Sequence, residues 1–370
     1  MTAILEYIWI DGNGEFRSKT KVIPQERYKF KIIKESDILN NPEYYWNFDG
    51  SSTNQSVTEK SDLLLIPVFI CKNPFYVQAY DMNNSARVAT AYLVLCDVWI
   101  DINTPHPTNT HVKLAKYYED KRVCEQEPWF GIEQEYFIMK HNPQTNNPWN
   151  TPYGWTADKD GKMLAPYGDI QGPYYCSIGS RNNLGREISE EHMLKCLEAD
   201  IKICGTNAEV APSQWEFQIG ICDHQDIANH LIVARYILER VAEKHGCWIN
   251  YHPKPIPGFN GSGCHTNFST KLMREEGGIK FIDRAIDKLA EKHREHIEVY
   301  GKDNDMRLTG IHETSSIDEF SRGDCNRGSS IRIPINVMRD KKGYFEDRRP
   351  AANMDPYLVC AKLIETIILN

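Results

Sequence analysis

Acidic residues recur inside short stretches whose composition indicates β-strands. In the run from Phe130 to Met139, side chains alternate, so Glu133 and Glu135 share one face while apolar residues occupy the other. Similar runs carry the other polar residues that could share a site with them, namely Glu209, Glu216, His265 and Glu346. Unpaired buried carboxylates repel one another and cost several kcal/mol each. If these side chains converge, they therefore require cations.

The types of these residues restrict the cation. Carboxylate oxygens with one imidazole suit Mg²⁺ or Mn²⁺, whereas structural zinc favours thiolates in a closed tetrahedron. Each run taken singly also fits an ordinary half-solvated sheet, and spacing alone does not establish convergence.

Arginines in the last third of the chain add a second kind of chemistry. The guanidinium group matches carboxylate and phosphate oxygens two at a time, which favours an anionic substrate and a phosphate-bearing cofactor. For a lone arginine, surface ion pairing is the alternative interpretation. Neither a P-loop nor a dinucleotide-binding glycine motif occurs. The arginines are Arg307, Arg327, Arg332, Arg348 and Arg349.

The elements that must position these residues indicate an α+β protein with two domains. A hairpin is predicted around Asp11–Gly14, and two further β-rich runs follow before a proline- and asparagine-rich break at 101–109. Helical periodicity dominates beyond the break. We predict domains at residues 1–104 and 105–370. The predicted helices are 111–123, 190–204, 226–245, 278–300 and 356–369.

Composition excludes several classes of protein. A net charge of −8 without a basic block argues against a nucleic-acid partner. The eleven cysteines include no C-x-x-C pair and suit buried thiols in a reducing compartment. No export signal and no apolar run of membrane-spanning length is present. We expect a cytoplasmic protein with small-molecule ligands and no membrane association.

Several long motifs closely resemble the glutamine synthetases of the eukaryotic class, over nearly the whole chain. The resemblance implies a small N-terminal β-grasp domain and a catalytic domain whose curved antiparallel sheet holds at least two Mg²⁺ or Mn²⁺ ions. The motifs are Trp46–Thr53, Asn207–Val210, Trp215–Gln218, Gly263–Asn267, Met306–Gly310, Asn326–Pro334 and Tyr344–Pro350.

The resemblance also implies roles for individual residues. Glu135, Glu209 and Glu216 resemble the ligands of one ion, and Glu133, His265 and Glu346 those of the other. Asp49, Glu313 and Arg327 resemble catalytic residues. The glutamate contacts would be Arg307, Arg348, Gly258, Phe259 and Gly261, and the ATP contacts Glu133, Glu216, Asn267, Ser269, Arg327, Arg332, Tyr344 and Glu346.

The implied reaction joins glutamate and ammonia to form glutamine, with ATP as co-substrate and a γ-glutamyl phosphate intermediate. The resemblance implies a ring oligomer, a decamer of two stacked pentamers, in which Asp49 reaches the site of a neighbouring subunit. A γ-glutamyl-alkylamine ligase and a non-catalytic ring-forming relative are the alternatives. The loop Pro257–Gly261 is one residue shorter than the family pattern, while Ile221 and Ile335 replace a common proline and a common arginine.

Overall fold

The computed structural model describes residues 2–24, 34–76, 88–166, 168, 171–180 and 182–370, and these form two compact units. The first unit runs from Met1 to Val112 and includes Lys195–Ile201. The second comprises Lys113–Leu194 and Lys202–Asn370. The predicted combination of α and β structure is confirmed.

The first unit is built on a six-stranded sheet in the order β2-β1-β5-β4-β3, with β6 paired to β5. The predicted hairpin is confirmed: Asp11 in the β1–β2 turn accepts hydrogen bonds from the backbone N–H groups of Asn13 and Glu15 at 2.7 and 3.0 Å. Strands β1 and β5 run parallel, and the other pairs are antiparallel. The strands are β1 Thr2–Ile10, β2 Phe16–Pro24, β3 Trp46–Asp49, β4 Asp62–Lys72, β5 Val88–Asp101 and β6 Thr104–Pro105, and the helix α1 spans Glu35–Ile38.

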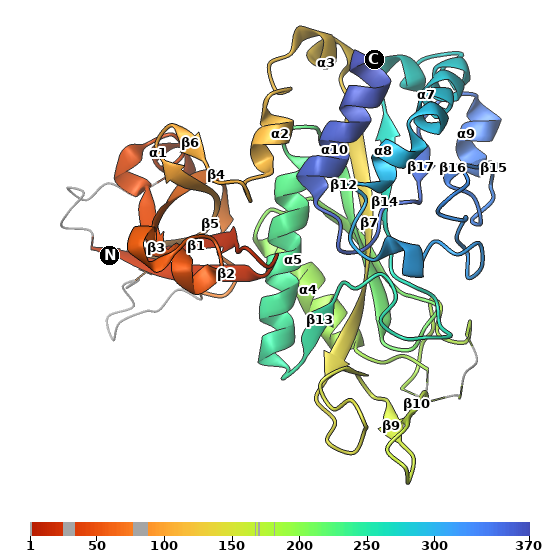
Figure 1. The fold of residues 1–370 in the computed structure, drawn as a ribbon, viewed down its shortest axis with the longest axis horizontal. Coiled ribbons are helices and arrows are strands. Elements are labelled where there is room, and N and C mark those ends of the chain that lie inside the picture. Colours follow the sequence, from red (N-terminus) through yellow and green to blue (C-terminus); the bar gives the residue numbers. More distant parts are fainter. Residues whose placement is uncertain (1, 25–33, 77–87, 167, 169–170, 181) are drawn as a thin grey trace. The chain divides into compact units, whose positions relative to one another are not determined.

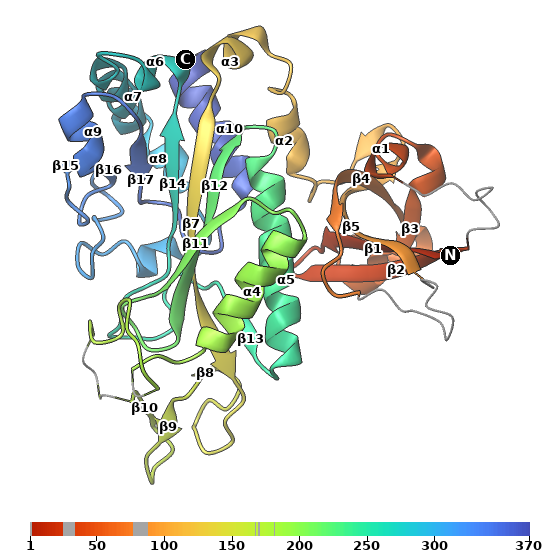
Figure 2. The ribbon, with the colours of Figure 1, turned by 180° about the vertical axis from the view of Figure 1, so that it is seen from behind.

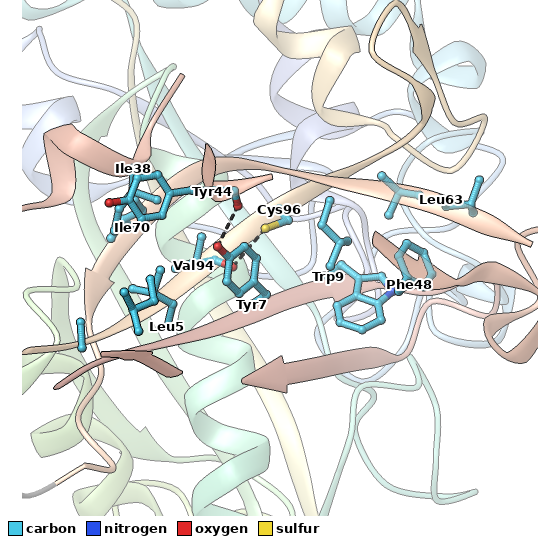
Figure 3. Packing of buried hydrophobic residues seen from close by; sticks show 14 residues of the cluster. Leu5, Tyr7, Trp9, Ile38, Tyr44, Phe48, Leu63, Ile70, Val94 and Cys96 are labelled. Atoms are coloured by element: carbon cyan, nitrogen blue, oxygen red, sulfur yellow. Dashed lines mark hydrogen bonds between the residues drawn. The ribbon is translucent and has the colours of Figure 1, made fainter. Parts of the chain in front are cut away.

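One face of this sheet carries an apolar core, shown in Figure 3. Trp9 stacks on Phe48 with ring centroids 4.7 Å apart. Tyr7 is fully buried, and its hydroxyl donates to the backbone carbonyl of Tyr44 at 2.7 Å. Each large apolar side chain buried in this way stabilises the fold by roughly 1.5–3 kcal/mol.

The second unit contains a nine-stranded, strongly curled sheet in the order β11-β12-β7-β14-β17-β16-β15, with β8 and β13 also paired to β7 (Figures 1 and 2). The expected curved sheet is therefore present. It is antiparallel except for the parallel pair β15–β16. Its strands are β7 Trp129–Lys140, β8 Thr151–Pro152, β11 Ile203–Ala208, β12 Gln214–Asp223, β13 Trp248–Asn250, β14 Cys264–Ser269, β15 Arg322–Asp324, β16 Ile331–Ile333 and β17 Phe345–Asp347; β9 Thr156–Ala157 and β10 Met163–Leu164 form a separate hairpin.

Two helices, α4 (Arg186–Glu198) and α5 (Ile227–Lys244), cover one face of this sheet. His192 of α4 packs edge-on against Phe217 of β12, with ring centroids 4.8 Å apart. Arg235 of α5 donates to the Gln134 side chain of β7 at 2.7 Å. Because side chains alternate along β7, Glu133 and Glu135 lie on the face that these helices leave open.

The remaining helices agree in part with the prediction. The predicted helix at 111–123 is wrong as a single element, since Asp120 caps a new helix by accepting from the backbone of Arg122 at 2.9 Å. Helix α4 ends before the predicted limit because Ile203 begins β11. The helices are α2 His111–Ala115, α3 Lys121–Gln126, α6 Lys271–Arg274, α7 Ile279–Glu291, α8 His293–Ile297, α9 Ile335–Asp340, α10 Pro356–Ile364 and the π-helix η6 Glu365–Leu369.

All eleven cysteines carry free thiols. Seven are buried, as expected, but the expectation is wrong for the exposed residues Cys124, Cys176, Cys204 and Cys325. Among the described residues, no helix combines the length and apolar character needed to cross a membrane.

Candidate active site

Strand register brings the predicted acidic residues together on the open face of the second unit's sheet. Glu135 of β7 lies opposite Glu216 of β12, and Glu133 lies opposite His265 of β14. On β17, Glu346 pairs with Arg332 of β16. Neighbours across strands on one face are within side-chain reach of one another. The convergence that spacing alone left open is therefore present.

The converging side chains form two groups. In each group the candidate ligand atoms lie within 4.8 Å of one another. Oxygen-rich donors at this separation suit Mg²⁺ or Mn²⁺. The first group is Glu135, Glu209 and Glu216, and the second is Glu133, His265 and Glu346.

Burial shapes the electrostatics of the first group. It raises the pKa of Glu135 to about 7 and that of Glu209 to about 8, the latter helped by the Glu135 charge. Burial and the charge of Glu133 hold the pKa of Glu216 well above its usual value. These carboxyl groups resist carrying three negative charges together unless positive charge is supplied.

The second group contains an imidazole that stays neutral. Burial, followed by the neighbouring Arg348 guanidinium, holds the pKa of His265 well below its usual value. Its Nδ1 lies 3.7 Å from a Glu133 oxygen and 3.6 Å from a Glu346 oxygen. Glu346 is fully buried and accepts hydrogen bonds from Arg332 at 2.5 Å and from Arg348 at 2.6 Å.

Three further residues hold the carboxylates in place, and our sequence analysis did not assign them a role. Asn207 donates to Glu209 at 2.9 Å, and Gln218 donates to Glu216 and to the Asn207 oxygen. The backbone N–H of Gly263 donates to Glu135 at 2.7 Å. Gln218 shares the face of Glu216 two residues away, so strand alternation was the signal for its position.

A polar cavity of about 690 Å³ opens over both groups. Three of the predicted arginines line it, which gives it the means to hold anionic substrates. A second, mostly apolar cavity of about 640 Å³ shares Glu133, Gln218 and Tyr344 with the first. The predicted site residues lining the first cavity are Glu133, Glu135, Glu209, Glu216, His265, Glu313, Arg327, Arg332, Tyr344 and Arg348; those lining the second are Glu133, Asn267, Ser269 and Tyr344.

The predicted glutamate loop is only partly at the cavity wall. Gly261 packs so closely on Arg307 that an added Cβ would lie 2.9 Å from the arginine Cγ. Phe259 instead packs edge-on against Trp155, with centroids 5.2 Å apart, in an apolar cluster. Gly258 is exposed, with φ +83°. The structure therefore brings Gly261, but neither Phe259 nor Gly258, to the described cavities.

Glu313 and Arg307 meet in a smaller recess beside the first group. Glu313 and His312 both adopt left-handed backbone conformations, with φ +62° and +56°. Such strain in non-glycine residues is common at functional loops. Arg307 is buried and donates to His265 at 3.1 Å and to the Arg348 carbonyl at 2.8 Å.

One arginine from the sequence analysis belongs elsewhere. Arg349 is fully buried, and its guanidinium pairs with Asp347 at 2.7 Å on the opposite face of the sheet from Glu346. Its grouping with the site arginines is wrong, because alternation along the extended chain places every second residue behind the sheet.

Asp49 lies in the first unit, exposed at the end of β3. Its carboxylate accepts hydrogen bonds from the hydroxyls of Ser51 and Ser52 at 2.6 and 2.7 Å. These bonds, with Ser51 first, lower its pKa. The Asp49 carboxylate is therefore ionised and held in one orientation.

This fold and site define an ATP-dependent carbon–nitrogen ligase, since residues 106–297 match the family model described as the glutamine synthetase catalytic domain. The chain is 47% identical to a putative glutamine synthetase of Acanthamoeba polyphaga mimivirus, covering 99% of this chain and 94% of that protein. It is 48% identical to the glutamine synthetases of Tuber borchii (98% and 92% covered) and Bos taurus (98% and 89% covered). The chain belongs to the glutamine synthetase family.

Proposed function

We propose that the chain is a glutamate–ammonia ligase. ATP transfers its terminal phosphoryl group to the side-chain carboxylate of glutamate, and ammonia then displaces phosphate from the acyl phosphate. The products are glutamine, ADP and phosphate. The observation that carries the proposal is the presence of both acidic groups, with all six predicted members, and five of these six residues line one arginine-lined cavity.

The residues fit a pair of divalent cations. We assign one ion to Glu135, Glu209 and Glu216, and the other to Glu133, His265 and Glu346. Bound Mg²⁺ or Mn²⁺ supplies the positive charge that phosphoryl transfer between anionic groups requires. Burial of negative charge raises the pKa values of Glu135 and Glu209 in the first group. A bound cation would neutralise this same buried charge.

Arginines hold the anionic substrates. Arg332 and Arg348 both donate to Glu346, and both line the polar cavity. We assign Arg327 and Arg332 to phosphate and Arg307 and Arg348 to the glutamate carboxylates. Fixed cations aimed at developing charge typically lower a barrier by several kcal/mol.

The nucleotide would extend from the polar cavity into the apolar one. The two cavities share Glu133, Gln218 and Tyr344, so a phosphate chain at the acidic groups leads directly to an apolar wall for the base. We assign Asn267, Ser269 and Tyr344 to this part of the site.

Ammonium must lose a proton before it attacks. We assign its binding and deprotonation to Asp49 and Glu313, whose carboxylates attract the cation and accept the proton. The loop carrying Glu313 would exclude water from the acyl phosphate. We propose that Asp49 acts in a neighbouring copy of the chain, within a ring oligomer of ten subunits.

Two other functions are set aside by specific residues. A ligase for alkylamines needs a wider amine pocket, and Asp49 and Glu313 are retained instead. A non-catalytic relative is expected to have lost at least one metal ligand, whereas both groups are complete.

The test is phosphate release by the purified protein with ATP, Mg²⁺ and glutamate, comparing ammonium, methylamine and no amine, with the product identified by mass. Glutamine formed only with ammonium, and lost in Glu133→Ala and Glu346→Ala, is the expected result. Preferential reaction with methylamine would reassign the protein to alkylamine ligation. No turnover by an intact oligomer that binds Mn²⁺ would make it non-catalytic.

A further inference from the structure

A buried chain of hydrogen bonds lies behind β17, on the face opposite Glu346. It begins in the π-helix η6 at the C-terminus and ends at a backbone carbonyl below the loop of Glu313. Its side chains are at most 7% exposed. In order they are Thr366, His296, Tyr300, Asp347, Arg349 and His293, and the last contacts the carbonyl of Ile317.

Asp347 is the centre of this chain. The Tyr300 hydroxyl donates to one of its oxygens at 2.6 Å. Arg349 donates through Nη2 to that oxygen at 2.7 Å, and through Nε and its backbone N–H to the other oxygen at 2.9 and 3.1 Å. The two parallel N–H···O bonds from the guanidinium group hold the pair in one geometry.

The direction of the bonds on one side of Asp347 follows by elimination. The Tyr300 hydroxyl gives its proton to the carboxylate, so it accepts from Nδ1 of His296, 2.6 Å away. Burial lowers the pKa of His296 to about 3, which leaves the ring neutral. Its Nε2 must then accept from the Thr366 hydroxyl at 2.9 Å.

The bonds on the other side are directed in the same way. Arginine only donates, so Nδ1 of His293 accepts from Arg349 at 3.0 Å. The ring's other nitrogen, Nε2, then donates to the Ile317 carbonyl at 2.8 Å. Ile317 donates in turn to the carbonyl of Leu308, 2.9 Å away, and these two residues close the loop that holds Glu313.

Two site residues flank Asp347 in the sequence. Glu346 and Arg348 point to the cavity side and bond to each other at 2.6 Å. Since Asp347 accepts the backbone N–H of Arg349, the backbone on both sides of Arg348 is fixed by bonds made on the buried face. A rotation of β17 that broke these bonds would move both site residues together.

We propose that this buried chain is a positioning device for the active site. Tyr300 and Asp347 set the orientation of Glu346 and Arg348 from behind β17, and His293 ties the base of the Glu313 loop to the same strand. The inference rests on the proposed function, because that function assigns Glu346 to a metal ion and Arg348 to glutamate.

The test removes one hydroxyl far from the cavity. Tyr300→Phe deletes the donor to Asp347 and the acceptor for His296 while keeping the ring. We expect the dissociation constant for Mn²⁺, measured by electron paramagnetic resonance on the folded protein, to rise by about tenfold, which is typical of lost support behind a metal ligand. We expect kcat for glutamine formation to fall by a similar factor.

A matched control separates positioning from simple loss of stability. The Tyr357 hydroxyl is also buried and donates at 2.6 Å, but to Asn229, between α10 and α5. Tyr357→Phe should also lower the melting temperature, with Mn²⁺ affinity unchanged. Thr366→Val, at the far end of the buried chain of hydrogen bonds, should also weaken Mn²⁺ binding. This variant decides the question if Tyr300→Phe does not fold.

The proposal would be overturned if Tyr300→Phe and Thr366→Val fold and bind Mn²⁺ as tightly as the wild type does. Failure of the proposed function has a different signature, which is a wild-type protein that binds Mn²⁺ and makes no glutamine. In that case the Mn²⁺ measurements on Tyr300→Phe and Thr366→Val still decide whether the buried chain positions Glu346.

Discussion

Glu135 lies directly opposite Glu216 in the antiparallel pairing of β7 with β12. Like charges in this relation destabilise a sheet, and burial of both carboxyl groups adds to the cost. The two strands nevertheless pair over most of their length, because Trp215, Phe217 and Tyr136 pack on the other face. Apolar packing thus holds in place an acidic pair that a divalent cation would stabilise.

Glu216→Gln should separate folding from metal binding. It replaces a buried carboxyl group whose ionisation is opposed by burial and by the neighbouring carboxylates with a neutral amide, so the free energy of unfolding of the metal-free protein should rise by about 1 kcal/mol. Saturating Mn²⁺ should stabilise the wild type by about 2.7 kcal/mol at a hundredfold excess over its dissociation constant, and the variant by much less. Urea unfolding with and without Mn²⁺ measures both. Glu298→Gln, at an exposed position, is the control; equal stabilisation of both variants by Mn²⁺ would refute the assignment of Glu216.

Gly263→Ala should damage the site without unfolding the protein. A Cβ at this position would lie 2.5 Å from Nη2 of Arg307 and 2.6 Å from Nε2 of His265. Arg307 is buried and hydrogen-bonded, so it can move only by giving up its contacts with the site. We expect kcat/KM for glutamate to fall about 10²-fold, as for a displacement near 1 Å, with an unchanged circular dichroism spectrum. Full activity of Gly263→Ala would show that the function of Arg307 does not require its close approach to Gly263.

Short-range pattern predicted which face each acidic residue takes, but not which residues meet. Alternation along β7 correctly placed Glu133 and Glu135 together. Their partners come from β12, β14 and β17, and the register of these strands depends on long-range packing and on the irregularity between Ile219 and Cys222. A one-residue slip would have moved Glu216 to the buried face.

The errors have similar physical causes. Arg349 has the same parity as Asp347 in an extended chain, so alternation already indicated that it faces the core. The helix predicted at 111–123 fails because Asp120 offers its side chain to the backbone and begins a new helix. Phe259 shares a loop with Gly261, yet its apolar ring is better satisfied against Trp155 than at a polar cavity.

Asp49→Asn should weaken the binding of ammonium and leave phosphoryl transfer from ATP to glutamate unchanged. The amide keeps the shape that Ser51 and Ser52 hold, but it loses the charge that attracts ammonium. Loss of a charge-assisted contact corresponds to roughly 10- to 100-fold in binding, so KM for ammonium should rise by that factor. Steady-state kinetics with ammonium, compared with hydroxylamine, a neutral nucleophile, measure the effect. Equal losses with both amines would count against a role for Asp49 in binding the cation.

The buried side chain of His192 should make the stability of the protein fall in acid. Burial lowers its pKa from 6.5 to about 4, and its Nε2 lies 3.0 Å from the Ala234 carbonyl. The unfolded chain binds this proton below pH 6.5, while the folded protein stays neutral at His192 until about pH 4. The stability that neutral His192 contributes is thus present above pH 6.5 and is lost as the pH falls through this range, by about 1.4 kcal/mol per pH unit.

Replacing the titrating group should reduce this dependence. In His192→Gln, the free energy of unfolding measured in urea between pH 6.5 and 4.5 should fall less steeply than in the wild type, because one fewer proton is taken up on unfolding. Part of the slope should remain, since burial also lowers the pKa of His230 to about 4 and that of His296 to about 3. His141→Gln is the control for replacing a histidine at an exposed position. If the free energy of unfolding of His192→Gln depends on pH as steeply as that of the wild type, protonation of His192 does not contribute to the loss of stability in acid.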